Sequence, residues 1–254
     1  MYFVFRRPIN AATVRRRLRD VGLRCRRPKK GYILTQRHKA GRLAWARVHQ
    51  RWTRRQWGSV LFSDESKFNV QNCDGRVRVY RPNGERFLDK HVKKCNRGAG
   101  GSVHVWAGIS QFHRTDLVIL NRNVNARAYI DDVLRPVALP FLRRHFGAGG
   151  FNFQQDNAPA HTARLTTQFL AANNVPTMNW PSLSPDMSPI EHVWDMLGRR
   201  VKARFPQPNN VQELTHALVQ EWRQIPQQQI ANLVLSMRRR CLACVAADGS
   251  YTRY

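Results

Sequence analysis

Acidic residues are scarce in this sequence: 16 Asp and Glu stand against 43 Lys and Arg in 254 residues, a formal net charge of +27. A chain with so few acids repels itself unless it meets a polyanion, and nucleic acid is the most common such partner. The deficit is greatest in residues 1–60, which hold 18 Lys and Arg and the single acid Asp20. This quarter is the stronger candidate for salt-dependent phosphate contacts, although a solvated basic tail would have the same composition.

Cysteine and long apolar runs are also scarce. The 5 cysteines are scattered and odd in number, which disfavours a disulfide framework and suits a reducing compartment. Cys241 and Cys244 form a lone C-x-x-C with no second pair to complete a zinc site, so we expect two ordinary helix cysteines. No apolar run reaches the length of a membrane span, and Met1–Phe5 is too short for a signal peptide. We therefore expect no membrane partner.

Hydrophobic residues make up 42% of the chain, enough for one substantial packed core. The basic N-terminal part has a helical pattern. Asn10 is placed to cap a helix over residues 11–20, Thr35 a longer helix to about residue 52, and Thr53 a short third one. Residues 24–31, rich in basic residues with one Pro and one Gly, are typical of a linker.

Strand patterns follow from residue 60. The apolar run Val60–Phe62 predicts a buried strand that ends before the acids at 64 and 65. Further strands are predicted at 67–70, 77–80, 102–109, 117–120 and 151–155, with a helical segment at 126–146 that Pro136 and Pro140 should kink or break. From about His161 the chain is mainly helical. This order predicts an α/β fold, a mixed sheet flanked by helices and preceded by a short basic helical segment.

Three acids are candidates for chemistry. Asp64 and Asp156 follow the ends of predicted strands, where α/β folds gather functional groups, and Glu191 opens a predicted helix. If the strands are neighbours, the three carboxylates can converge. Carboxylate oxygens are the ligands that Mg²⁺ prefers, and two such ions can stabilise the attacking and leaving oxygens of a phosphoryl displacement.

Each acid also has a simpler interpretation. Glu191 stands three residues after Ser188 and could serve only in a capping box, as Glu213 could with Asn210. Asp156 could belong to an ordinary turn, and either Asp64 or its neighbour Glu65 could simply be solvated. The 34 residues between Asp156 and Glu191 decide little, because roughly one acid pair at that spacing is expected by chance.

The residues around the acids are more specific. Gln154–Ala163 (QQDNAPAHTA) and Ser184–Trp194 (SPDMSPIEHVW) resemble the segments that carry the second and third acids of the Tc-one/mariner superfamily of DDE transposases, in its Tc-one branch. Leu61–Ser66 (LFSDES) resembles the first-aspartate motif and Gly101–Ile109 (GSVHVWAGI) the central strand. The motifs occur in the family's order, and the resemblance extends from about Asn10 to the C-terminus.

This resemblance implies a ribonuclease-H-like fold in which Asp64, Asp156 and Glu191 are both the catalytic residues and the metal ligands, holding two Mg²⁺ ions, with Mn²⁺ as a substitute. Asp195, one helical turn after Glu191, is a competing third carboxylate. His161, like Asn157, belongs to the second motif and would orient Asp156 or contact DNA, but it could equally be an ordinary helix-start histidine.

The resemblance also implies a domain plan. Residues 1–30 would be the remnant of a helix-turn-helix module, 31–57 a basic helical linker and 58–254 the catalytic domain. Because family members carry two such modules, we expect an N-terminally shortened chain. The candidate DNA-binding residues are the basic ones of this part: Arg15, Arg16, Arg17, Arg19, Arg24, Arg26, Arg27, Lys29 and Lys30.

The function implied is cut-and-paste DNA transposition: metal-dependent hydrolysis of a phosphodiester at a terminal inverted repeat of double-stranded DNA, then strand transfer into a TA target. We expect a nuclear location, since Arg24–Lys30 resembles an import signal, and a homodimer as a candidate assembly. The alternatives are a catalytically inactive DNA-binding relic and a general two-metal nuclease that hydrolyses DNA without joining it.

Overall fold

The computed structural model describes residues 10–23, 33–70, 100–121, 123–147 and 150–254. The predicted strand at 77–80 and the linker at 24–31 lie outside these residues. The chain divides into two units, Met1–Ile33 and Leu34–Tyr254. In the first unit, helix α1 (Ala11–Asp20) begins as predicted at Asn10, whose Oδ1 accepts the Ala12 N–H at 2.8 Å. No residue of α1 is buried.

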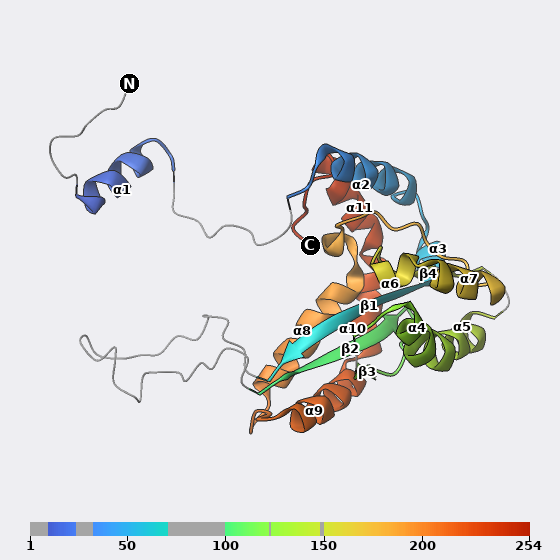
Figure 1. Ribbon diagram of the computed structural model, residues 1–254. Coiled ribbons are helices and arrows are strands. Elements are labelled where there is room, and N and C mark those ends of the chain that lie inside the picture. The colour runs from blue at the N-terminus through green and yellow to red at the C-terminus, as the bar shows by residue number, and fades with distance from the viewer. Residues whose placement is uncertain (1–9, 24–32, 71–99, 122, 148–149) are drawn as a thin grey trace. The chain divides into compact units, whose positions relative to one another are not determined.

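The second unit is built on a four-stranded sheet in the order β3-β2-β1-β4 among the described residues (Figure 1). β1 (Val60–Asn69) lies antiparallel to β2 (Ser102–Ile109) and parallel to β4 (Asn152–Gln154), and β3 (Val118–Leu120) is antiparallel to β2. The mixed sheet predicted from the sequence is therefore confirmed.

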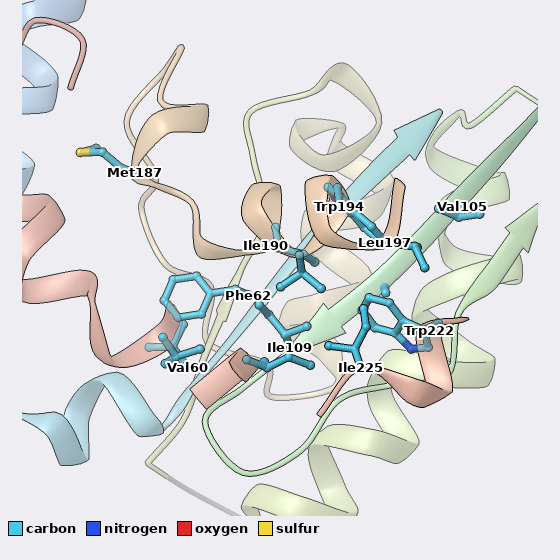
Figure 2. Close-up of a cluster of buried hydrophobic side chains, with 14 of the residues drawn as sticks. Val60, Phe62, Val105, Ile109, Met187, Ile190, Trp194, Leu197, Trp222 and Ile225 are labelled. Carbon is cyan, nitrogen blue, oxygen red and sulfur yellow. The ribbon is translucent and has the colours of Figure 1, made fainter. Parts of the chain in front are cut away.

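Helices cover both faces of this sheet. One face packs against the C-terminal helices, and Figure 2 shows Ile190, Trp194 and Leu197 of α8 against Phe62 and Ile109 of the sheet. The other face, with Leu61, packs against the helical segment at 126–146 and α7. The helical elements of this unit are α2 (Gln36–His49), α3 (Arg54–Gly58), α4 (Ala126–Ala128), η2 (Tyr129–Ala138), α5 (Leu139–Phe146), α6 (Pro159–Thr162), α7 (Arg164–Ala172), η3 (Pro185–Met187), α8 (Pro189–Ala203), α9 (Val211–Gln224), α10 (Gln227–Leu235) and α11 (Met237–Ala246).

One predicted boundary was wrong, and one predicted irregularity takes a different form. The strand predicted to end at Phe62 continues through Asp64 and Glu65 to Asn69, because β1 pairs with β2 from Phe62 to Asn69 and the hydrogen-bond ladder does not depend on apolar side chains. The segment 126–146, which its prolines were predicted to kink or break, stays helical past both of them but changes helix type between Tyr129 and Ala138. Pro136 lies inside η2, a π-helical stretch whose wider turn accommodates it, and Pro140 follows the junction of η2 and α5.

Some of the predicted helix caps are confirmed and one is wrong. Thr35 and Thr53 cap α2 and α3 as predicted, each in a reciprocal capping box. The Asn210 Oδ1 accepts the Glu213 N–H at 2.8 Å. The Glu213 carboxylate accepts the Asn209 N–H and not the N–H of Asn210, the cap residue. The Ser188–Glu191 capping box was wrong: Ser188 makes no cap hydrogen bond, and its hydroxyl is buried without a partner among the described residues.

The C-terminal helix, α11, contacts the first helix of the same unit, α2. α11 packs against α2 (Figure 1), and its Cys241 and Cys244 are buried free thiols, the ordinary helix cysteines that were expected. The chain then turns at Gly249, which has a φ of +73°, and a Cβ there would lie 2.0 Å from the Lys39 carbonyl oxygen. This contact therefore requires glycine. In the described part of the chain, no helix is long and apolar enough to span a bilayer.

Candidate active site

The register of the sheet brings Asp64 and Asp156 together. In the parallel pair of β1 and β4, Phe62 lies opposite Gln154. Asp64 and Asp156 each stand two residues beyond this last pair, so the two residues lie side by side where the β1–β4 pairing ends. Asp156 follows the end of β4 as predicted, whereas Asp64 lies within β1, and only the β1–β4 pairing ends before it.

Asp64 lies on the sheet face covered by α8. Its Oδ2 accepts the indole N–H of Trp194 at 3.0 Å. Burial raises the pKa of Asp64 well above its usual range, and the negative charges of Glu191, Glu65 and Asp156 raise it further, against the lowering effect of the Trp194 hydrogen bond. Asp64 is thus a carboxylate crowded by other carboxylates.

Asp156 is held by a histidine. Its Oδ1 accepts the Ala158 N–H at 2.9 Å and lies 2.7 Å from Nδ1 of His161. Partial burial alone would raise the pKa of Asp156, but the hydrogen bonds from His161 and Ala158 outweigh this effect and lower the pKa. His161 is therefore not an ordinary helix-start residue, because it orients the Asp156 carboxylate.

His161 links Asp156 to a second acid. Its Nε2 lies 3.2 Å from Oε1 of Glu65, which follows Asp64 in β1 and points to the opposite sheet face. Burial would lower the pKa of His161, but the hydrogen bonds to Asp156 and Glu65 raise it to about 10. Beneath the imidazole lies the fully buried ring of Tyr129, 4.3 Å away between centroids, whose hydroxyl donates to Gln155.

Glu191 is at the start of α8, one turn before Trp194. Without the predicted capping box, its carboxylate is exposed and makes no hydrogen bond among the described residues. Desolvation by neighbouring atoms and the charge of Asp156 raise the pKa of Glu191. The competing acid Asp195 is exposed and pairs with Arg199 at 3.0 Å on the same helix. Glu191 and not Asp195 is therefore coupled to the other two acids.

Among the three carboxylates, only Asp156 has a basic partner in the described residues, the His161 imidazole at 2.7 Å. None of them pairs with a Lys or Arg in the described residues, and each interacts with at least one of the others. No group of three described His, Cys, Asp or Glu side chains lies at the distances of a complete metal site. Carboxylate oxygens whose negative charge no Lys or Arg compensates nevertheless fit the chemistry of a hard divalent cation.

The structure describes some of the predicted DNA-contact residues and not the others. Arg15, Arg16, Arg17 and Arg19 are exposed on α1, whose first turn also holds no acid. The others, Arg24, Arg26, Arg27, Lys29 and Lys30, lie outside the described residues.

Two site residues were missed by the sequence reasoning. Trp194 was part of a quoted motif, and its spacing of three residues from Glu191 could have placed both on one face of α8. Glu65 was considered only as a solvated neighbour of Asp64. Its contact with His161 joins residues 96 positions apart, and no local pattern signals it.

Two family models match this chain. Residues 59–215 match the family model described as a DDE superfamily endonuclease, and residues 7–51 match a helix-turn-helix model described as a transposase. The Tc1 transposase of Caenorhabditis elegans is 37% identical over 95% of this chain and 87% of its own length. The Tcb2 transposase of Caenorhabditis briggsae is 38% identical over the same shares.

Solved structures show the same fold. The Mos1 mariner paired-end complex with Mn has a TM-score of 0.79 at 20% identity, covering 96% of this chain and 72% of the solved one. The Mos1 catalytic domain has a TM-score of 0.68 at 17% identity, covering 89% of this chain and all of the solved one. The class is therefore that of ribonuclease-H-like DDE endonucleases. Within it, the chain belongs to the Tc-one/mariner family of DNA transposases.

Proposed function

We propose that Asp64, Asp156 and Glu191 are the catalytic residues of a transposase that cuts and rejoins DNA with two divalent cations. The observation that carries this proposal is the cluster itself: three carboxylates around one sheet edge, with raised pKa values at Asp64 and Glu191 and no Lys or Arg partner in the described residues. Such a cluster is unfavourable unless a cation shares it. Structures of the Mos1 transposase with Mn and with Mg are among the structural relatives, which supports Mg²⁺ with Mn²⁺ as a substitute.

The protein's own residues prepare the site. Trp194 fixes one oxygen of Asp64, and His161 with the Ala158 N–H fixes one oxygen of Asp156, so each carboxylate keeps its other oxygen for a ligand. Glu191 is free to reach the same ligand from α8. Bound cations would supply charge stabilisation for in-line displacement at phosphorus. One carboxylate set then serves both hydrolysis at the element's end and attack of the freed 3′-hydroxyl on target DNA.

We further propose that the partner is double-stranded DNA, bound at terminal inverted repeats and joined at TA sites in the nucleus by a homodimer. The Mos1 paired-end and strand-transfer complexes support the DNA partner, as does the match of residues 7–51 to the helix-turn-helix model. The exposed arginines of α1 would contact phosphates and belong to the proposed DNA-binding segment 1–30. Residues 31–57 would link it to a catalytic domain at 58–254.

A strand-transfer assay on pre-cleaved transposon ends tests the chemistry. Asp64→Asn, Asp156→Asn and Glu191→Gln should each reduce joining with Mg²⁺ or Mn²⁺ to background while DNA binding remains. Asp195→Asn is the matched control, since this acid lies one turn further along α8 in an exposed pair with Arg199, and it should retain joining.

Each rival has its own outcome in this assay. A DNA-binding relic shows neither nicking nor joining in the unsubstituted chain. A general nuclease shows hydrolysis without joining. A variant of one of the three acids that joins DNA at the unsubstituted rate removes that residue from the site.

A further inference from the structure

A groove of about 1050 Å³ lies beside the acid cluster, between α2 and the segment 179–182. One wall is a face of α2 that carries Arg37, Gly41 and Trp45. The other wall holds Asn179 and Ser182, and Asn157 lines the groove next to Asp156 in the chain. The site described above uses none of these side chains.

The groove has the chemistry of a phosphodiester binder. No acid lines it, and α2 contains no acidic residue. Arg37 is exposed and forms no ion pair with any described residue. Amide and hydroxyl groups on the opposite wall add polar contacts of the kind that hold a DNA backbone in register. A wall that carries an exposed arginine and faces neutral polar groups suits a polyanion such as a DNA strand.

The floor of the groove is rigid and aromatic. Trp45 stacks on His49 at 3.9 Å between ring centroids and meets Trp180 edge-on at 4.8 Å. Both tryptophans are buried, so they form a fixed apolar surface under the groove. Asn157 is also fixed, because its Nδ2 donates to the Trp180 carbonyl oxygen at 2.8 Å. The groove is therefore preformed and continuous with the loop that carries Asp156.

We propose that this groove binds the DNA strand that continues from the scissile phosphate, with Arg37 on its backbone. The proposal rests on the proposed function, since it takes Asp156 as the position of that phosphate. A strand held at Asp156 must leave the site on one side, and Asn157 opens a path along α2. Gly41 keeps this path open: a Cβ there meets no atom within 4 Å, so a larger side chain would project into the groove without disturbing the helix.

Binding of nested duplexes tests the proposal. The probes carry the terminal repeat that flanks the coding sequence and either stop at the scissile phosphate or extend past it on one side or the other. Anisotropy is measured on the Asp64→Asn background, so that binding is read without cleavage. Arg37→Glu and Gly41→Trp should weaken binding about tenfold for the duplexes extended on one side, and not for those truncated there. Arg37→Ala should reduce the slope of log affinity against log salt by about 0.9.

Two variants are matched controls. Gly41→Ala adds only a methyl group in open space and should bind like the parent. Arg47→Glu changes the charge of the same helix at an exposed position outside the groove and should also bind like the parent.

Three outcomes overturn the proposal. In the first, Arg37→Glu and Gly41→Trp bind every duplex like the parent. In the second, Arg47→Glu loses as much DNA affinity as Arg37→Glu, and in the third, Gly41→Trp changes only the oligomeric state. Failure of the proposed function is distinguishable, because it appears as joining activity that survives Asp64→Asn. The role of the groove is tested by DNA affinity alone.

Discussion

Arg42 and Asp186 form a buried bidentate ion pair, with Nη1 donating to one carboxylate oxygen at 2.8 Å and Nη2 to the other at 2.7 Å. Their side chains are 0% and 5% exposed. Arg42 also donates to the Gly249 carbonyl oxygen, and Asp186 accepts the Thr252 N–H. One pair thereby joins α2, the turn that leads into α8 and Glu191, and the C-terminal segment.

Removing one partner of this pair should be severely destabilising. Arg42→Met leaves the Asp186 carboxylate buried without its cation, and breaking a buried pair in this way costs about 3–5 kcal/mol. Urea unfolding of the variant against the parent measures the loss. The double variant Arg42→Met with Asp186→Leu should lose less than the sum of the single changes, because no buried charge is left over. A loss below about 1 kcal/mol in Arg42→Met contradicts this role.

The same pair should make stability depend on acid pH. Burial alone would raise the pKa of Asp186, but the hydrogen bonds from Arg42 and Thr252 outweigh it and lower the pKa from 3.8. Because the folded pKa is depressed, the stabilisation is present above the unfolded pKa and is lost as pH falls through the folded pKa. The stability gap between the parent and Asp186→Asn should therefore be constant near neutrality and shrink below pH of about 4. Urea midpoints across this range measure it, and a gap that widens on acidification contradicts the assignment.

His161 should act on metal use through Asp156. His161→Gln removes the contact of 2.7 Å that fixes the Asp156 carboxylate, and loss of such an orienting partner costs about 10–100-fold in metal affinity or activity. The concentration of Mn²⁺ that gives half-maximal joining should rise accordingly. Glu65→Gln keeps the His161–Asp156 contact and should show a smaller rise. Equal metal dependence in the parent and His161→Gln would show that the histidine is only structural.

The predictable parts of the fold depend on local signals. Helices begin at Asn10, Thr35 and Thr53, whose side chains cap them. The strand at 102–109 follows from the regular alternation of apolar residues along the sequence. The missed parts depend on distant partners. Asp64 lies within β1 because β2 extends the ladder past the apolar run.

The site follows the same division. Asp64, Asp156 and Glu191 could be selected as candidates from the motifs around them. Their surroundings could not, because the contacts of Trp194 with Asp64 and of His161 with Glu65 join segments far apart in the chain. Ser188 is the clearest failure of a local rule: its spacing to Glu191 is that of a capping box, yet its hydroxyl is buried and unpartnered among the described residues.

Ser188 and Asn210 therefore make a matched pair of cap substitutions. Asn210→Ala removes a cap that accepts the Glu213 N–H at 2.8 Å and should cost about 1 kcal/mol of unfolding free energy. Ser188→Ala removes a hydroxyl without a partner and should change stability by less than about 0.5 kcal/mol. Urea unfolding of the two variants checks this order. A cost for Ser188→Ala equal to that for Asn210→Ala would mean that the capping bond forms in solution.

Trp194 should support catalysis through its indole N–H rather than through its bulk. Trp194→Phe keeps an aromatic ring against Trp222, 5.5 Å away, but removes the donor to Asp64 at 3.0 Å. A hydrogen bond to a charged group contributes about 1.5–3 kcal/mol, so joining should fall by about 10-fold or more. The matched control is Trp222→Phe, because the Trp222 N–H donates to the Thr115 carbonyl oxygen, away from the acids. If the stability loss of each variant is measured alongside joining and both variants lose joining equally, the effect of Trp194 lies in packing and not in its contact with Asp64.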